Sequence, residues 1–443
     1  MRVCGSVIFG LSFSSQNAYY ALIDSCTDRK TIWCADAGTH RARESTESDI
    51  AMVGSSSADS TLPAASSALS APILTDGWNQ IAVPCLKFDG PKADSWYDVS
   101  GLVGAGLRIL KDKLILFERK QVVELWNDLN SFLTKKGVNE INEKVFSIYG
   151  SPGVGKSCEV WAWCLKIARQ EQLDVLWVHV DKFAKATCIE KRGNDWYRCR
   201  ATASELSVIL ENSQANVLVF DGFECHDHVF CSCLLHLLPE KFPERKVVIV
   251  SSLGAGLQPK HLGVDLSEFK QFEMDPWTLE QFLCACKSTA FFNSVIGCFD
   301  VDKSSPPPNS EMVETLVKQK FYFAGASARW MFQHTTHEIK GIIRVLLEQV
   351  RVTTSLMSFT TGLHSSESNN HLLLKFRDED GPKTFFVSQC ALDFALRRWG
   401  SGTDIKYAYS LAEKHTNPAF LGCVVQFDFF DQIKIVASLS DPH

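Results

Sequence analysis

The eight-residue run Gly150–Ser157, GSPGVGKS, constrains the fold of this chain more than any other feature. It matches the phosphate-binding pattern G-x-x-x-x-G-K-[ST] at every fixed position. The apolar run Val145–Tyr149 before it predicts a buried strand, and Cys158–Ala168 after it predicts a helix. A strand, a glycine-rich loop and a helix are the setting in which this pattern binds phosphate, whereas a chance glycine turn before a helix is the alternative.

The chemistry of this pattern predicts a nucleotide site with ATP and Mg²⁺ as its ligands. The glycines let the backbone turn tightly enough to point successive N–H groups at phosphate oxygens, and the positive end of the following helix adds to the attraction. Lys156 would reach the β- and γ-phosphates, and the Ser157 hydroxyl would bind Mg²⁺. The predicted ATP-binding residues are Gly150, Ser151, Pro152, Gly153, Val154, Gly155, Lys156 and Ser157.

The composition is that of a globular protein, with 45% hydrophobic and 22% charged residues. A net charge of -6 argues against a protein that coats nucleic acid, so charge alone does not favour direct DNA binding. The 16 cysteines follow no disulfide-framework spacing, and we expect them to be reduced and mostly buried. No uncharged apolar stretch reaches the roughly 18 residues of a transmembrane helix, so we expect no membrane partner.

Around the loop, apolar runs of strand length alternate with longer amphipathic stretches. This alternation indicates βαβ units, and nearly continuous apolar strands indicate a parallel sheet that is covered on both faces. We therefore predict an α/β fold with a parallel sheet. The other expected strands are Val175–Val180, Val217–Asp221 and Lys246–Ser252, and the other expected helices are Val122–Leu133, Ala203–Leu210, Cys231–Leu238, Leu279–Ser288, Glu311–Gln319, Ser327–His334 and His337–Gln349.

Shifts in composition predict the boundaries of five regions. Residues 1–43 form a small N-terminal segment or a degenerate leader, because Met1–Phe13 only faintly resembles a secretory signal. Residues 44–75 are rich in serine and alanine and are expected to be a linker. The remaining regions are the P-loop α/β core with its N-terminal extension at 76–276, a helical lid at 277–350, and a small mixed α/β C-terminal region at 371–443.

A P-loop domain needs a second acid, which holds Mg²⁺ from the end of a neighbouring strand. Asp221 ends an apolar run and fits this role, although an Asp-Gly pair can also simply begin a turn. Glu224 could polarise an attacking water, or it could be a solvated loop acid. Ser251 and Ser252 end the next strand, where a polar side chain could sense the γ-phosphate or merely cap the strand.

An arginine follows a turn of small residues in the predicted lid. Gly325, Ala326 and Ser327 would let a helix start close against its neighbour. Arg329 could then reach the γ-phosphate and couple hydrolysis to lid motion. Pairing of this arginine with a surface carboxylate is the alternative.

One segment is crowded with potential metal ligands. Its histidines and cysteines match no zinc-binding spacing, so a helix with buried cysteines is the better interpretation. These residues are His226, His228, Cys231, Cys233 and His236.

Several of these segments resemble the Crinkler effectors, which plant-pathogenic oomycetes and some fungi deliver into host cells. The most specific stretch is Lys320–Phe332, KFYFAGASARWMF. The likeness covers roughly residues 110 to 430 and extends to the retrotransposon hot-spot proteins, which share the P-loop module. The other similar stretches, in the same order as in the family, are Leu116–Lys120, the Gly150–Ser157 loop, Val217–Asp221, Met274–Glu280 and Asn417–Gly422.

The resemblance implies an ATPase module of the AAA/STAND type that is delivered into a host cell. In many members this module precedes a restriction-endonuclease-like domain that acts on DNA in the host nucleus. Lys156, Ser157 and Asp221 would then serve nucleotide and Mg²⁺, with Arg329 as a sensor. Two features depart from the family. Residues 1–75 contain no Leu-Phe-Leu-Ala-Lys translocation motif, and Gln426 stands where relatives place the glutamate of a nuclease. We therefore expect an effector-like ATPase switch without nuclease activity, and a module that binds a host protein without turnover is the alternative.

Overall fold

The computed structural model describes the parts of the chain that surround the predicted loop. The chain divides into two units, Met1–Ser70 and Ala71–His443, and every described residue belongs to the second. The predicted linker at 44–75 and the predicted helix Cys231–Leu238 lie outside the described residues. The described residues are 77–83, 92–98, 105, 107, 115–134, 143–181, 185–223, 245–252, 262, 264–301, 308–349, 371–378 and 381–399.

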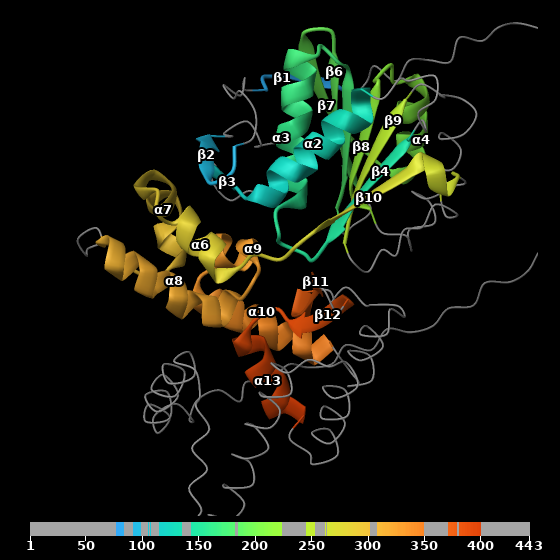
Figure 1. The fold of residues 1–443 in the computed structure, drawn as a ribbon. Coiled ribbons are helices and arrows are strands. Elements are labelled where there is room, and N and C mark those ends of the chain that lie inside the picture. Colours follow the sequence, from blue (N-terminus) through green and yellow to red (C-terminus); the bar gives the residue numbers. More distant parts are fainter. Residues whose placement is uncertain are drawn as a thin grey trace, which may run out of the picture. The chain divides into compact units, whose positions relative to one another are not determined.

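A mostly parallel sheet of eight strands is the largest sheet among the described residues (Figure 1). Five neighbouring strands, β5, β8, β9, β4 and β10, run parallel to one another, which confirms the predicted α/β fold with a parallel sheet. In spatial order the strands are β1 (Asn79–Ile81), β7 (Asp195–Ala201), β6 (Ala186–Arg192), β5 (Val175–Val180), β8 (Val217–Phe223), β9 (Lys246–Ser251), β4 (Val145–Gly150) and β10 (Phe269–Met274).

An antiparallel extension, which the sequence pattern did not predict, widens this sheet. β6 and β7 form a hairpin in which Arg192 pairs with Asp195, so its loop is the dipeptide Gly193-Asn194. Gly193 has a φ of 60°, a left-handed conformation that such tight turns favour. A separate two-stranded pair, β2 (Ser95–Asp98) and β3 (Ile115–Glu118), precedes the first helix of the core.

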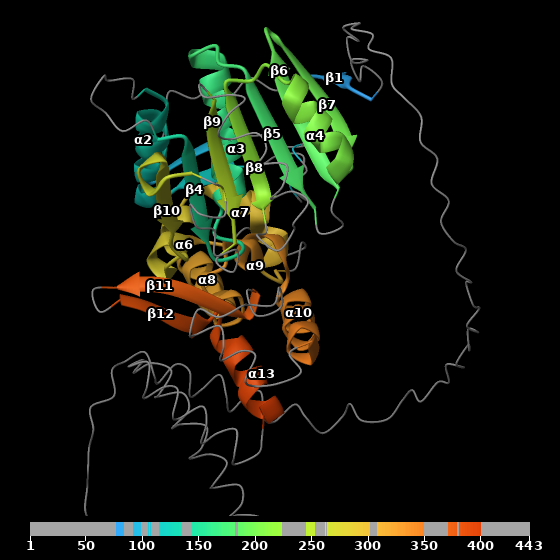
Figure 2. The same cartoon turned by 90° about the vertical axis from the view of Figure 1, so that its right-hand side faces the viewer.

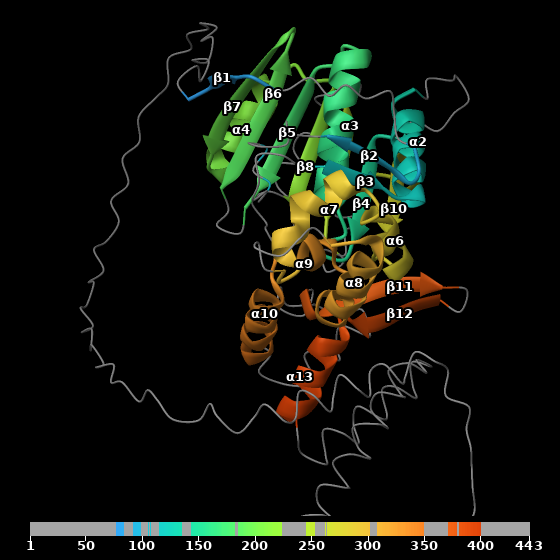
Figure 3. The same cartoon turned by 90° about the vertical axis from the view of Figure 1, so that its left-hand side faces the viewer.

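Helices cover both faces of the sheet (Figures 2 and 3). Trp177 and Val219 belong to the cluster that includes α2 (Lys120–Thr134) and α3 (Lys156–Gln170). The alternate side chains, such as Leu176 and Leu218, pack with α4 (Ala203–Asn212) on the other face. Burial on both faces explains why these strands are nearly continuous apolar runs.

The region predicted as a helical lid follows β10. Its aromatic side chains pack together, with the Trp277 ring stacked on Phe282 at 5.0 Å and Phe332 edge-on to both. The expected helix Leu279–Ser288 is shorter, because the Ser288 hydroxyl accepts a hydrogen bond from Phe291 N and starts a new helix. The described elements are α6 (Leu279–Ala285), α7 (Thr289–Val295), η6 (Ile296–Cys298), α8 (Ser310–Ala324), α9 (Ala328–Gln333) and α10 (Thr336–Gln349), with η5 (Leu266–Glu268) just before β10.

The last described elements are a hairpin and a helix, which we call the C-terminal unit. It comprises β11 (Leu373–Asp378), β12 (Gly381–Phe386) and α13 (Gln389–Trp399), and α13 packs against α8 and α10. The small-residue turn of the lid meets this unit directly, because Ala326 N donates to Val387 O at 3.1 Å. Within the described ranges, no helix is long and apolar enough to cross a membrane.

Candidate functional site

The Gly150–Ser157 loop lies where the parallel strand β4 ends and α3 begins. Two of its glycines are held by close neighbours. A Cβ at Gly150 would stand 2.4 Å from Met274 O, at the end of β10, and a Cβ at Gly153 would stand 2.5 Å from the Ser327 hydroxyl. Gly153 also has a φ of 80°. The loop therefore needs glycine at these positions for both space and conformation.

The start of α3 offers backbone N–H groups to an anion. The helix begins at Lys156, and its N-cap is Gly155, with φ 109° and no side-chain hydrogen bond to the first turn. The first N–H groups of a helix have no partner within the helix, and they attract negative charge together with the helix dipole. The loop thus has the construction of a phosphate cradle.

Lys156 carries a buried amine at the centre of this cradle. It is 8% exposed, and its Nζ donates to Gly150 O at 2.7 Å and to Ser151 O at 2.9 Å. Burial, followed by the nearby positive charge of Arg329, lowers the pKa of Lys156 to about 7, while Asp221 opposes the shift. The two carbonyl oxygens are neutral and Arg329 is itself positive, so the positive charge of this buried amine is only partly balanced. A polyphosphate would supply the missing negative charge.

Ser157 and Asp221 meet at the end of the loop, as the sequence predicted for a Mg²⁺ site. The Ser157 hydroxyl donates to Asp221 Oδ1 at 2.7 Å, and the Asp221 side chain is 2% exposed. Hydroxyl and carboxylate oxygens are the ligands that Mg²⁺ prefers, so these two residues fit the ion. A third residue, which the sequence analysis did not single out, joins them: His179 Nδ1 lies 2.6 Å from Asp221 Oδ2.

Arg329 lies beside the loop, at the start of α9. Its backbone N–H donates to Gly153 O at 3.2 Å, and a Cβ at Gly153 would stand 3.0 Å from the Arg329 Cβ. Within the described part of the chain, Arg329 has no carboxylate at ion-pair distance, so the surface pairing considered from sequence is not seen there. The lid therefore touches the phosphate loop through the turn that carries this arginine.

Two more side chains donate hydrogen bonds to the backbone of the loop. Arg119 Nη2 donates to Val154 O at 3.3 Å, and Trp277 Nε1 donates to the same oxygen at 2.9 Å. The Arg119 guanidinium also lies 5.0 Å from the centre of the Trp277 ring. Arg119 and Trp277 belong to the stretches Leu116–Lys120 and Met274–Glu280, and the likeness of these stretches to the Crinkler effectors is the one sequence signal that marks them.

Other predicted residues lie at the edge of the site or outside the described residues. Glu224 and the whole cluster of histidines and cysteines between 226 and 236 are outside them. Ser251, 3% exposed, ends β9 between the strands of the loop and of Asp221. Gly222 follows Asp221 with φ 77°, and a Cβ there would stand 2.5 Å from Val180 O, so a side chain is excluded at that position.

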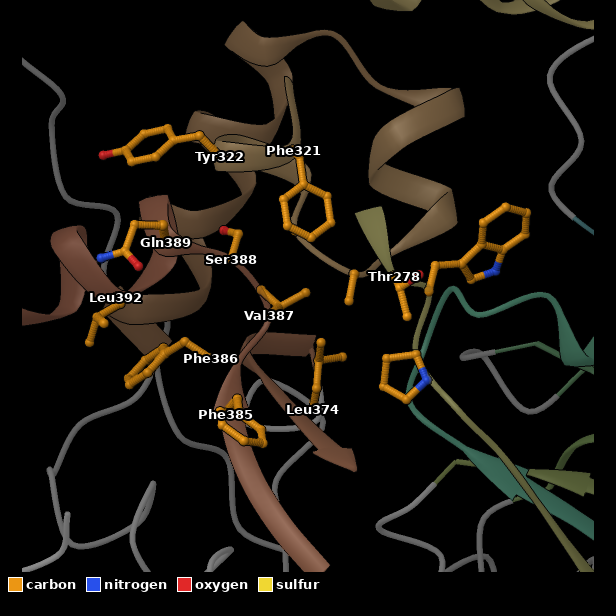
Figure 4. A pocket seen from close by; sticks show the side chains of 14 residues that line it. Thr278, Phe321, Tyr322, Leu374, Phe385, Phe386, Val387, Ser388, Gln389 and Leu392 are labelled. Carbon is orange, nitrogen blue, oxygen red and sulfur yellow. The ribbon is translucent and has the colours of Figure 1, made fainter. Parts of the chain in front are cut away.

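A pocket of about 350 Å³ lies on the other side of the lid turn (Figure 4). It is lined by mostly apolar residues from the segment after β10, from α8 and from the C-terminal unit, such as Phe321, Leu374 and Phe386. None of its lining residues belongs to the Gly150–Ser157 loop. The predicted nucleotide site and this pocket are therefore separate features.

A mostly parallel α/β sheet, a phosphate loop after the inner strand β4 and an acid on the nearby strand β8 define a P-loop NTPase-type domain. No family model and no curated protein matches the chain. Among solved structures, it is similar to domain III of the replication initiation protein DnaA from Thermotoga maritima, with TM-score 0.29, 12% identity, and 58% of this chain and 91% of that chain covered.

Two other solved structures show a similar degree of likeness. A variant of RuvB from Thermotoga maritima has TM-score 0.31 and 13% identity, with 62% of this chain and 94% of that chain covered. A signal transduction ATPase with numerous domains and a tetratricopeptide repeat sensor, from Pyrococcus horikoshii, has TM-score 0.24 and 13% identity, with 73% of this chain and 50% of that chain covered. Because these TM-scores are low, the fold class rests on the strand order and the loop of this chain.

Proposed function

We propose that this protein binds ATP with Mg²⁺ at the Gly150–Ser157 loop and works as an ATPase switch. The observation that carries the proposal is the contact of Ser157 with Asp221 at 2.7 Å, beside the buried amine of Lys156, which donates to two backbone carbonyls. Residues 64 positions apart in the chain meet where a P-loop protein holds its metal.

Each residue has a defined task in this proposal. The N–H groups at the start of α3 bind phosphate oxygens, and Lys156 neutralises the β- and γ-phosphates. Ser157 and Asp221 hold Mg²⁺, which would neutralise charge that develops on the phosphates during hydrolysis. Arg329 contacts the γ-phosphate and thereby makes the position of the lid depend on whether ATP or ADP is bound.

The alternative is a binding module that nucleotide stabilises but that does not turn ATP over. The glycine after Asp221 favours this alternative, because it leaves no room there for an acid that could polarise a water. Glu224 would have to supply that group instead.

We further propose that the protein is a Crinkler-like effector that acts in host cells, with a host protein as its target. The support is the order of the similar stretches in the sequence and the contacts of their residues: Arg119 and Trp277 both bind Val154 O. Expression of the tagged protein in plant cells tests this role. Enrichment of a plant protein with wild type but not with Lys156→Ala would support it, and the absence of any specific plant partner would contradict it.

Assays on the purified protein distinguish ATP hydrolysis from ATP binding without hydrolysis. ATP affinity and phosphate release are measured for wild type, Lys156→Ala and Asp221→Asn, with Lys120→Ala as the matched control because Lys120 is 86% exposed. Lys156→Ala should lose most of the binding, and Lys120→Ala should lose none. Asp221→Asn should keep nucleotide but slow hydrolysis at least about tenfold, which is about 1.4 kcal/mol of barrier. Unchanged affinity in Lys156→Ala would refute the nucleotide site, and binding without hydrolysis in wild type would favour the alternative.

A further inference from the structure

His179 is the second-last residue of β5 and lies beside the strand that carries Asp221. The two strands run parallel, and their register pairs His179 with Asp221 directly. Parallel strands end at the same edge of a sheet, so both side chains reach the edge where the phosphate loop lies. The contact joins residues 42 positions apart.

Both oxygens of the Asp221 carboxylate have a partner in this arrangement. Ser157 donates to Oδ1 at 2.7 Å, and His179 Nδ1 lies 2.6 Å from Oδ2. The terminal torsion of an aspartate has broad preferences and is easily turned unless contacts fix it. The histidine contact therefore holds the carboxylate in the one rotation that keeps Oδ1 toward Ser157.

The burial of the pair makes the contact more effective. The Asp221 side chain is 2% exposed and the His179 side chain 18% exposed. Water can therefore hardly replace the imidazole as a hydrogen-bond donor to Oδ2. Leaving a buried carboxylate oxygen without a donor costs free energy. A histidine ring N–H can donate to a carboxylate oxygen, and the 2.6 Å separation of Nδ1 and Oδ2 is that of such a hydrogen bond.

We propose that His179 is a positioning residue for the metal site: it orients Asp221 so that Oδ1 and the Ser157 hydroxyl face Mg²⁺ together. This inference rests on the proposed ATP and Mg²⁺ site. Partners of this kind behind a metal-holding carboxylate set metal affinity, and their loss typically costs about 10–100-fold. A purely structural histidine would instead stabilise the fold without any specific effect on the metal.

Three variants separate these roles. His179→Phe keeps a ring of similar size but has no donor, whereas His179→Asn places an amide N–H at about the position of Nδ1. Asp221→Asn, alone and combined with His179→Phe, shows whether the histidine acts through the aspartate. The readout is binding of a fluorescent, non-hydrolysable ATP analogue in EDTA and across a Mg²⁺ titration, with circular dichroism as the check on folding.

His179→Phe should need about 10–100-fold more Mg²⁺ to reach its full affinity, with little change in EDTA. His179→Asn should recover most of that loss, and His179→Phe should add nothing in the Asp221→Asn background. A wild-type Mg²⁺ requirement in His179→Phe, or an equal loss in EDTA, would overturn the inference while leaving the nucleotide site intact. If wild type itself bound the analogue without regard to Mg²⁺, the metal site and this inference would both fail.

Discussion

Replacing Gly325 by alanine should disrupt the contact between the lid turn and Val387 of the C-terminal unit. Gly325 follows α8 as its C-cap, with φ 52° and ψ -137°, a conformation open only to glycine. A Cβ there would stand 1.7 Å from Val387 O and 2.6 Å from Val387 C. Both atoms belong to the backbone, so no side-chain rotation can make room for Gly325→Ala.

The cost of this substitution has two parts. The backbone conformation adds about 1–3 kcal/mol for a residue with a side chain. The overlap with Val387 adds a similar amount, about 1–3 kcal/mol, if the neighbouring chain shifts to relieve it. The free energy of unfolding should therefore fall by about 2–6 kcal/mol. At about 2 °C per kcal/mol for a domain of this size, the melting temperature should fall by several degrees.

Gly341→Ala is the matched control, because Gly341 lies within α10 and a Cβ there has no atom within 4 Å. Alanine in a helix is favoured over glycine by about 1 kcal/mol, so this variant should be as stable as wild type or more so. Thermal melts compare the three proteins. Hydrogen exchange then follows the Ala326 amide, which donates to Val387 O. A Gly325→Ala protein with the wild-type melting temperature and an equally protected Ala326 amide would refute the reasoning.

Three further predictions concern the lid and the proposed activity. Arg329→Ala should weaken ATP binding more than ADP binding, by about 1–3 kcal/mol, because only ATP offers a γ-phosphate to the guanidinium. Calorimetric titration with both nucleotides measures this, and Arg344→Ala is the control, because Arg344 packs over the Phe394 ring. An unchanged ATP-to-ADP preference in Arg329→Ala would count against the sensor role. Burial lowers the pKa of Lys320 to about 8. The unfolded chain keeps the lysine proton up to about pH 10.4, so the free energy of unfolding should rise by about 2 kcal/mol between pH 8 and pH 10. Urea unfolding at both pH values should show a smaller rise in Lys320→Met, and equal rises would exclude this lysine as the cause. No DNA cleavage should occur with Mg²⁺ or Mn²⁺, because Gln426, outside the described residues, stands where proteins of the family that this chain resembles place the glutamate of a nuclease. Metal-dependent nicking that co-purifies with the protein would show that other acids do this chemistry.

The phosphate loop could be predicted from sequence because its geometry depends on consecutive residues. Gly153 and Gly155 have φ values of 80° and 109°, which glycine adopts at little cost, and Lys156 follows at the first position of the helix. The parallel strands other than β10 could be predicted for a similar reason, since burial on both faces leaves a continuous apolar run such as Val217–Phe220. The alternating sequence of β10, FKQFEM, leaves no such run and was missed. Asp221 followed from the end of that run.

The β6–β7 hairpin was missed because buried charges interrupt its pattern. Glu190 and Lys191 are 2% and 8% exposed, and ion pairs to Arg192 at 2.6 Å and to Asp174 at 3.5 Å compensate them. A pattern of hydrophobicity cannot show which charged side chains will be buried beside a compensating partner, such as Asp174, which lies 17 positions from Lys191. The charged run therefore gave no sign of a strand.

The partners of the loop were decided by tertiary structure alone. His179 and Asp221 are neighbours only because β5 pairs with β8, and nothing in either run specifies that pairing. Arg119 and Trp277 lie 35 and 123 positions from Val154, yet both donate to its carbonyl oxygen. Backbone conformation and helix starts follow from local sterics and hydrogen bonding, which a short stretch of sequence contains. Contacts between distant segments depend on the order in which strands pair and on which faces must be buried together, and only the folded chain as a whole sets these.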